Sequence, residues 1–168
     1  YPVDVEVDLW ASGSPRDFIM VGMPDAAVRE SRERIKSALL NSGFGYPNKA
    51  VTINLAPANI RKEGAGFDLP MAVGILGAMG VARGADGRLF VGELSLDGSI
   101  RPVHGVLPVA VCARRSRATC LVAPEANAAE AAVVEGLTVY GVRHLSEVVA
   151  LLENPEKFAP ASAAAALS

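Results

Sequence analysis

The chain has 168 residues, of which 51% are hydrophobic and 20% charged. A chain of this length and balance fits one domain with its own core, which excludes a wholly disordered protein and one that needs a disulfide or metal to fold. The formal net charge of −2 excludes a global attraction to nucleic acid or to an anionic membrane, so any such contact requires a local patch.

The first third of the chain predicts two strands, a long helix and a third strand. Residues 3–9 alternate apolar and acidic side chains, as in a half-exposed strand, and residues 18–21 are all apolar, which indicates a buried one. A Gly13-Ser14-Pro15 cluster predicts the turn between them. A helix is expected from an N-cap at Asp25 through residue 43, and β-branched residues 51–55 predict the next strand.

The middle of the chain predicts a loop, a helix and a hairpin. Residues 57–66 are rich in turn residues, and Asp68 is a candidate N-cap for a helix through residue 79. Residues 90–103 predict two strands joined at Asp97-Gly98, a dipeptide that suits a tight turn. The apolar run that follows predicts a helix that begins near Val106.

The last third predicts alternating helices and strands. We expect helices over 106–114, 125–135 and 145–152, and strands over 120–123 and 137–142. The residue pattern alone supports an α/β or α+β fold in which helices are layered on a parallel or mixed sheet. After residue 153 the composition shifts to Ala, Pro and Ser, so we expect one domain over 1–153 and a linker or disordered tail over 154–168.

Three motifs resemble known families. Residues 92–106, GELSLDGSIRPVHGV, resemble the segment between strand and helix in the proteolytic domain of Lon-type proteases. Residues 22–34 (GMPDAAVRESRER), 54–58 (NLAPA) and 61–70 (RKEGAGFDLP) together resemble the N-terminal domain of the ComM (YifB) competence-protein family, whose members are labelled magnesium-chelatase-like ATPases. The resemblance covers roughly residues 3–153.

The resemblance implies a fold and a missing catalytic pair. It implies the ribosomal-protein-S-five domain-two-like fold of the Lon proteolytic domain, with helices on a mixed sheet and a left-handed βαβ crossover, against the usual handedness. Lon-type proteolysis uses a serine in a "GPSAG" turn and a lysine after the hairpin. Here residues 63–68 contain no serine and Leu107 stands where the lysine would be, so we expect no catalytic residues in this chain.

Several charged residues have both a binding and a structural interpretation. Arg29, Arg32 and Lys36 recur at helical spacing, with Arg34, Arg61 and Lys62 expected nearby; they are candidate contacts for DNA or an adjoining subunit, or else a solvated face interleaved with Glu30 and Glu33. Lys62 and Glu63 are neighbours that could act as base and acid, but a structural or interface role is the alternative. Gly64 and Gly66 precede a helix without the lysine of a phosphate loop, so we expect no ATP site here.

The remaining reactive side chains point to no cofactor. Cys112 and Cys120 are expected to be reduced thiols, and His104 and His144 lack further ligands at metal-binding spacing. Trp10 is expected to pack rather than to stack on a base. No run approaches the ~18 apolar residues of a membrane span and no signal peptide opens the chain, which predicts a cytoplasmic protein without a membrane partner.

Three functions remain open from the sequence. The first is a non-catalytic N-terminal domain of a ComM-like AAA+ ATPase that remodels DNA, as in branch migration during natural transformation, where this segment serves assembly or DNA guidance. The others are a degenerate Lon-type hydrolase and a part of a magnesium-chelatase-type metal-insertion motor. The resemblance implies ATP and Mg²⁺ for the parent protein, further domains of the same chain, a ring-shaped homo-oligomer, and DNA as a candidate partner.

Overall fold

The computed structural model describes residues 2–11 and 17–164. The first half of the chain forms β1 (Asp4–Trp10), β2 (Phe18–Val21), α1 (Ala26–Arg29), α2 (Ser31–Asn41), β3 (Ala50–Ala56), the 3₁₀ turn η1 (Ala65–Phe67) and α3 (Asp68–Ala78). The second half forms β4 (Arg88–Phe90), β5 (Glu93–Leu94), β6 (Ile100–Arg101), α4 (Val106–Arg115), β7 (Cys120–Pro124), α5 (Glu125–Ala131), β8 (Val139–Val142), α6 (Leu145–Glu153) and the 3₁₀ turn η2 (Pro155–Lys157). The turn predicted at Gly13-Ser14-Pro15 lies outside the described residues.

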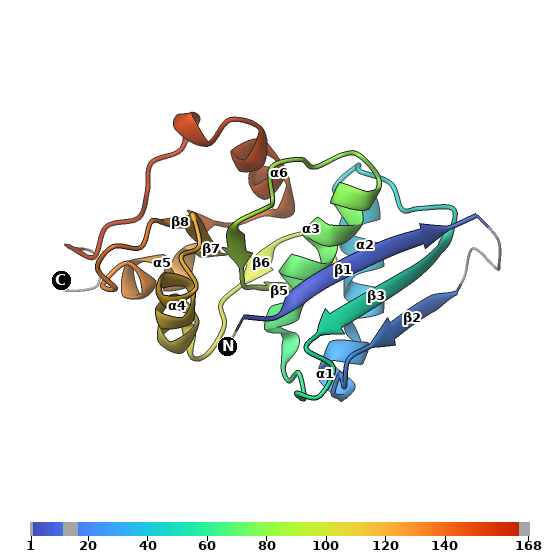
Figure 1. Cartoon of the computed structure of the whole chain (residues 1–168). Coiled ribbons are helices and arrows are strands. Elements are labelled where there is room, and N and C mark those ends of the chain that lie inside the picture. The colour runs from blue at the N-terminus through green and yellow to red at the C-terminus, as the bar shows by residue number, and fades with distance from the viewer. Residues whose placement is uncertain (1, 12–16, 165–168) are drawn as a thin grey trace.

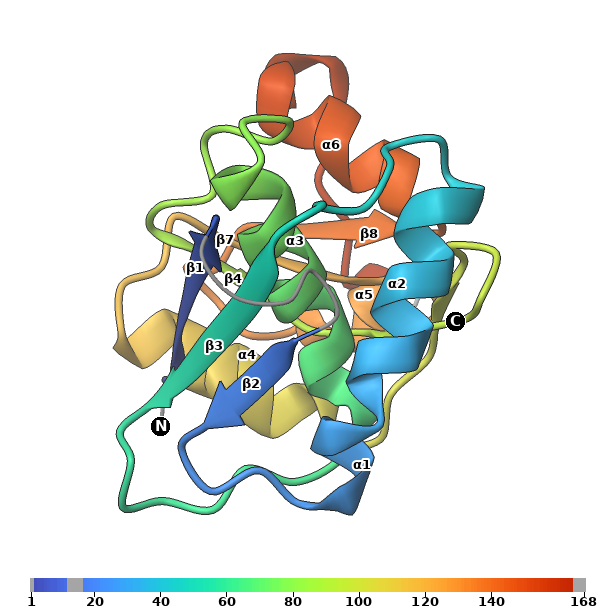
Figure 2. The same cartoon turned by 90° about the vertical axis from the view of Figure 1, so that its right-hand side faces the viewer.

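The first sheet has the strand order β1-β3-β2 and one face covered by helices. β1 pairs antiparallel with β3 and β2 pairs parallel with it, so the sheet is mixed. Helices α2 and α3 lie on the same side of this sheet, as Figures 1 and 2 show. The chain from β2 through α1 and α2 to β3 is a βαβ unit, which fits the fold class predicted from the sequence; the handedness of its crossover stays a prediction.

β2 is not the buried strand that its apolar run predicts. Phe18 and Met20 do pack against the core, but Ile19 is 52% exposed and Val21 45% exposed. The reason is position: β2 is an edge strand of a sheet whose second face no described helix covers, so alternate side chains reach solvent. Four consecutive apolar residues therefore do not mean burial on both faces here.

The second sheet is parallel, with the strand order β4-β7-β8 and β7 in its centre. All five residues of β7 are buried, because the two faces of this sheet pack into two different hydrophobic clusters. Leu121 and Ala123 face the cluster that includes the buried side of α4 and α5, whereas Cys120 and Val122 join the cluster around α3 and α6. The predicted alternation of helices and strands in the last third is confirmed.

The short hairpin β5-β6 is a two-stranded antiparallel sheet, separate from the two three-stranded sheets. Its turn lies at Asp97-Gly98 as predicted, and Gly98 has a φ of +91°. A Cβ at Gly98 would lie 2.3 Å from Ser42 Oγ, so both the backbone conformation and the close approach require glycine at this position.

The long helix predicted from Asp25 is divided at Glu30 into α1 and α2. Asp25 is the N-cap as expected, since its Oδ1 accepts from the amide of Val28 at 2.8 Å. In a continuous helix the carbonyl of Ala27 would accept from the amide of Ser31; here it accepts from Nη2 of Arg34 at 2.9 Å. A side chain thus supplies the hydrogen bond at the point where the helix is divided.

The first part of the stretch predicted as a linker or disordered tail packs against the rest of the chain. Residues 155–157 form the turn η2, Phe158 packs against the main core, and the amide of Ala161 donates to the carbonyl of Val139 in β8 at 2.7 Å. Apolar contacts of Phe158 and Ala161 and one hydrogen bond to β8 hold this stretch despite its Ala-Pro composition. The domain boundary at 153/154 stays a prediction.

All the described helices are short. The longest of them, α2 and α3, have 11 residues each, and no helix within residues 2–11 and 17–164 is both long and apolar enough to cross a bilayer.

Candidate functional site

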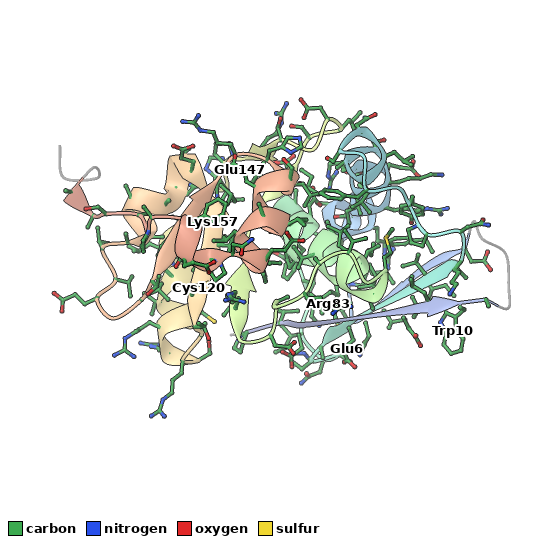
Figure 3. All side chains as sticks on the ribbon, turned by 90° about the horizontal axis from the view of Figure 1, so that it is seen from above. Glu6, Trp10, Arg83, Cys120, Glu147 and Lys157 are labelled. Atoms are coloured by element: carbon green, nitrogen blue, oxygen red, sulfur yellow. The ribbon has the colours of Figure 1, made fainter. Side chains whose placement is uncertain are left out.

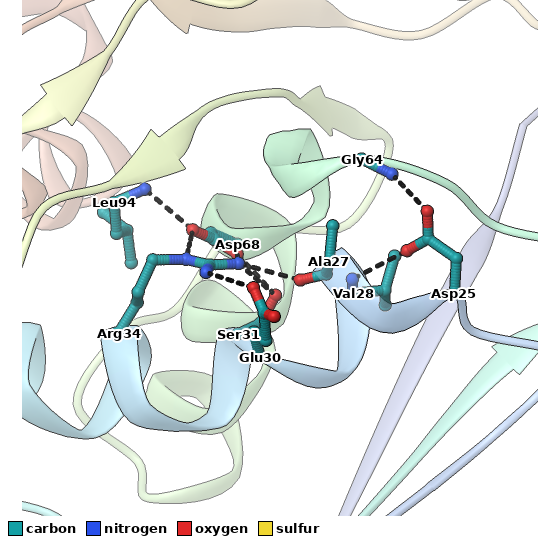
Figure 4. Close-up of polar contacts among 9 residues, drawn as sticks. All are labelled: Asp25, Ala27, Val28, Glu30, Ser31, Arg34, Gly64, Asp68 and Leu94. Atoms are coloured by element: carbon teal, nitrogen blue, oxygen red, sulfur yellow. Dashed lines mark hydrogen bonds and ion pairs between the residues drawn. The ribbon is translucent and has the colours of Figure 1, made fainter.

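A buried polar network joins α2, α3 and β5 at the start of α3. The carboxylate of Asp68 is fully buried and accepts four hydrogen bonds. Ser31 Oγ donates to Oδ1 at 2.5 Å, Arg34 donates through Nε to Oδ2 at 2.7 Å and through Nη2 to Oδ1 at 3.0 Å, and the amide of Leu94 donates to Oδ2 at 3.0 Å. Figure 4 shows these side chains converging from three elements.

This network corrects the role predicted for Asp68. The sequence suggested an N-cap, but Asp68 is the first residue of α3, and its carboxylate accepts from Ser31, Arg34 and Leu94 rather than from the amides of its own helix. The hydrogen bond from Arg34 to Asp68 raises the pKa of the guanidinium above its ordinary value, with the Asp68 charge acting in the same direction and burial opposing both. Four donors satisfy one carboxylate, which is the arrangement that allows a charge to be buried.

Lys62 is buried as well, although the sequence placed it among candidate surface contacts. Lys62 is 1% exposed. Its Nζ donates to the carbonyl oxygen of Gly22 at 2.6 Å and also to the carbonyl oxygen of Pro57. Its backbone amide donates to the carbonyl of Met23 at 3.0 Å, and its own carbonyl accepts from Asp25 at 2.9 Å. Lys62 therefore joins the end of β2 to the loop after β3, and its ammonium is not available to a phosphate.

The remaining residues of the predicted basic surface lie on α1, α2 and the loop beside them. Arg29 and Lys36 are exposed, and Arg32 lies with its guanidinium carbon 5.7 Å from the ring centre of Phe18. Lys36 Nζ lies 5.7 Å from the ring centre of Tyr46, and Arg61 Nε is 3.4 Å from Glu63 Oε1.

Arg34, the fourth basic residue of this helical segment, turns inward to Asp68 and is only 20% exposed. Of the predicted basic residues, Arg29, Arg32, Lys36 and Arg61 therefore reach the surface, whereas Arg34 turns inward and Lys62 is buried; their role as contacts for DNA or a subunit stays a prediction.

The positions that correspond to the Lon-type motifs lie in η1, at the start of α4 and on the hairpin. Ala65 and Gly66 form the turn η1 before α3, and a Cβ on Gly66 would lie 3.4 Å from Val91. Leu107 is the second residue of α4 and is 38% exposed. On the hairpin, Ser95 Oγ accepts from Arg101 Nε at 2.7 Å.

Both cysteines are unpaired thiols, and His144 lies at the start of a helix. Cys112 and Cys120 are free thiols, and burial raises the pKa of the Cys120 thiol. His144 is the N-cap of α6, with Nδ1 2.8 Å from Ser146 Oγ and Nε2 2.9 Å from the carbonyl oxygen of Asp97. In the described residues no three side chains of His, Cys, Asp or Glu come together as metal ligands.

Trp10, expected to pack, is 48% exposed, and its Nε1 donates to Thr52 Oγ1 at 3.1 Å across the outer face of the first sheet.

The sequence places both charged partners of the network beside buried positions without pairing them. Arg34 follows Ser31 by three residues and precedes Ile35 and Ala38 on the face of α2 that turns toward the core. Asp68 likewise lies next to Leu69 and near Met71, both fully buried, but neither pattern shows that Arg34 and Asp68 are partners. No periodicity could have revealed Lys62, because it lies in a loop.

Comparison with known proteins agrees with the motifs. The family described as "Subunit ChlI of Mg-chelatase" matches residues 5–127. Competence protein ComM of Haemophilus influenzae is 42% identical over 157 residues, which is 92% of this chain and 30% of that protein. The protein YifB of Escherichia coli is 41% identical over 155 residues, or 91% of this chain and 30% of that protein.

A weaker similarity supports the predicted fold. Lon protease 2 of Bacillus subtilis is 28% identical over 130 residues, which cover 76% of this chain and 23% of that protein. The chain thus spans about 30% of the length of the ComM and YifB proteins and a smaller share of the protease. The chain belongs to the Mg-chelatase ChlI subunit family, and over most of its length it is similar to ComM and YifB.

Proposed function

We propose that this chain is a non-catalytic N-terminal domain of a larger ComM-like AAA+ ATPase that remodels DNA, and that it serves assembly of the motor or guidance of DNA. ATP and Mg²⁺ would act in the part of the parent protein that lies outside this chain. The relatives leave room for such a part, because the chain matches about 30% of their length.

The hydrogen bonds of the buried Ser31 and Lys62 are the main support for the non-catalytic role. A Ser-Lys mechanism needs a lysine amine within hydrogen-bond reach of a serine hydroxyl. Ser31 Oγ instead donates to Asp68, and Lys62 Nζ donates to two backbone carbonyls. Both groups hold elements together: Ser31 joins α2 to the start of α3, and Lys62 joins the end of β2 to the loop after β3.

The turn before α3 does not fit a nucleotide. The Gly64-Ala65-Gly66 stretch leads into α3, and helix-start amides attract anions, but no lysine follows the glycines, and the next charged side chain, Asp68, is buried and paired with Arg34. The amide of Gly64 also already donates to Asp25 Oδ2 at 3.2 Å. These groups support the view that nucleotide chemistry belongs elsewhere in the parent.

The exposed cations on α1 and α2 support the DNA-guidance role. Arg29, Arg32 and Lys36 lie along two consecutive helices, and the loop that carries Arg61 runs beside the start of α1 because Lys62 pairs with Met23 and Asp25. Glu30, Glu33 and Glu63 lie between these cations, so the surface offers separate contact points rather than a uniform positive field.

A charge reversal in the full-length parent tests the DNA role. Replacing Arg29, Arg32 and Lys36 with Glu should weaken DNA binding and lower the salt dependence of the affinity, by about 0.9 in the log–log slope for each phosphate that the protein no longer neutralises. A control variant with Arg83, Arg115 and Lys157 replaced by Glu makes the same charge change on other elements. Equal affinity and slope for both variants would remove the DNA role and leave the assembly role.

The description of the matching family favours a second candidate, a part of a metal-insertion motor. The two candidates differ in what stimulates ATP turnover by the full-length parent. Stimulation by branched or single-stranded DNA supports the first, and stimulation by a porphyrin together with Mg²⁺ supports the second.

A further inference from the structure

The two edges of the first sheet are built differently. On the outer face, the edge strand β1 carries Asp4, Glu6 and Asp8 at alternate positions, and Figure 3 shows Glu6 and Trp10 on the side of β1 away from α2 and α3. Charges on an edge strand prevent it from pairing with another chain. The opposite edge, β2, has the sequence Phe-Ile-Met-Val and carries no charge at all.

β2 also presents apolar side chains to solvent. Ile19 and Val21 point to the outer face and are 52% and 45% exposed, and Met23, which follows the strand, is 52% exposed. Across the sheet they align with Thr52 and Asn54 of β3, which are polar and uncharged. An uncharged apolar edge strand without a covering element in the described structure is a surface for strand pairing.

The end of β2 is held firmly in place. Gly22 and Met23 both have positive φ, +113° and +60°, and a non-glycine residue rarely adopts such a backbone. Lys62 maintains this conformation, because its Nζ binds the Gly22 carbonyl and its amide binds the Met23 carbonyl. These hydrogen bonds fix the backbone just after β2, which lowers the conformational entropy that the strand end loses when it binds a partner.

We propose that β2 pairs antiparallel with β2 of a second copy of this chain, so that the two sheets form one continuous sheet across a two-fold axis. Opposed residues in an antiparallel pair point to the same face, which permits registers centred on a residue but not between residues. Centring on Met20 places Ile19 opposite Val21 of the partner on the outer face, twice by symmetry. These are apolar β-branched pairs of the kind that stabilise sheets.

Charge and geometry select this register. A shift toward the N-terminus, centred on Ile19, would place Asp17 opposite Val21 of the partner. A shift toward the C-terminus, centred on Val21, would extend the pairing beyond Gly22, where the backbone leaves the extended conformation. With Met20 at the centre Asp17 falls opposite Met23, where the backbone has already left the extended conformation, so no charged residue opposes a residue within β2. A two-fold interface needs only this one self-complementary surface. The inference uses the outer edge of β2 and does not rest on the proposed DNA or motor role.

Sedimentation of the purified chain over about a hundredfold concentration range tests the proposal. We expect a monomer–dimer equilibrium that Ile19→Lys weakens about tenfold or more, because two cross-strand pairs are lost and two charges are introduced. The matched control is Asp8→Lys, in the same row across the sheet through Thr52 but on β1. It should dimerise like the unmodified chain, and equal thermal unfolding of both variants shows that they fold.

Cysteine variants test the register. In a Cys112→Ser background, a mixture of Ile19→Cys and Val21→Cys chains should form a disulfide-linked heterodimer on mild oxidation, in clear excess over the homodimers formed by either variant alone. A chain that stays monomeric, a dimer that Ile19→Lys leaves intact, or homodimer links that equal the heterodimer link would each overturn the proposal. Strand pairing seen only with a different protein would overturn it as well.

Discussion

The two three-stranded sheets of the chain differ in how many of their faces are covered. The β4-β7-β8 sheet is packed on both faces, and its central strand is buried at every residue. Within residues 2–11 and 17–164, the β1-β3-β2 sheet is packed only on the side of α2 and α3, so β1 and β2 alternate between covered and exposed side chains. The second sheet is therefore part of the core, whereas in the described residues the first presents an exposed face and an apolar edge strand.

The buried network around Asp68 joins β5 to α2 and α3, the two helices that cover one face of the first sheet. Its disruption should have the largest effect on the free energy of unfolding. Asp68→Ala would leave Arg34 without its buried partner and Ser31 and the Leu94 amide without an acceptor. We expect a loss of about 3 kcal/mol in the free energy of unfolding, measured by urea denaturation.

Glu30→Ala is the control for this prediction. Glu30 lies 3.8 Å from the same Arg34 but is exposed, so its removal should cost less than about 0.5 kcal/mol. Similar losses for the two variants would show that the Asp68 network is not the support that its burial indicates.

A pair of truncations compares the contributions of the two sheets to stability. Leu121→Ala in β7 removes a fully buried side chain and should cost about 3 kcal/mol, whereas Ile19→Ala in β2 should change the stability of the monomer by less than about 0.5 kcal/mol. Both are measured by denaturation at a concentration where the chain is monomeric. A large loss at Ile19 would mean that the outer face is covered in solution.

Lys62→Met tests the anchor at the end of β2. The methionine keeps the apolar stem of the side chain but leaves the Gly22 and Pro57 carbonyls without their donor, which should cost about 2 kcal/mol. Hydrogen exchange of the Lys62 and Asp25 amides should accelerate more than exchange in β7. Unchanged exchange at both amides would contradict the anchoring role.

The smallest expected effect is a pH dependence at Tyr46. Burial raises the pKa of the Tyr46 phenol above its ordinary value, and the nearby charge of Arg32 partly opposes this. The stability that Tyr46 contributes is complete below its unfolded pKa and falls as the pH rises toward the folded pKa. The difference in ultraviolet titration between the unmodified chain and Tyr46→Phe should show a raised midpoint, and an ordinary midpoint would mean that Tyr46 is solvated.

The sequence predicted elements well where local signals were strong. The Asp97-Gly98 turn, the start of α4 at Val106 and the alternating helices and strands of the last third are confirmed, because turn chemistry and periodicity are local. Burial was predicted poorly at β2, because the same apolar run suits the interior of a parallel sheet and the edge of a mixed one. Only the arrangement of the sheets distinguishes the two.

The candidate site shows the same difference between features set by local signals and features set by long-range contacts. The positions of Ala65 and Leu107 in the turn before α3 and at the start of α4 agree with the motifs. The roles of Asp68 and Lys62 depend on partners 34 to 40 residues away, Arg34 and Gly22, and nothing in the local pattern distinguishes a buried charge from a cap or a surface cation. Long-range contacts therefore determine the roles of Asp68 and Lys62.

The proposed non-catalytic role requires that this chain has no activated serine, and covalent labelling tests that requirement most directly. The purified chain is incubated with a fluorophosphonate, which forms a bond to activated serines, and is then analysed by intact mass and peptide mass spectrometry, with a Lon proteolytic domain as the positive control. We expect an unchanged mass for this chain while the control is labelled. Stoichiometric labelling of one serine, abolished by replacement of that serine or of a lysine beside it, would show that the domain is catalytic after all.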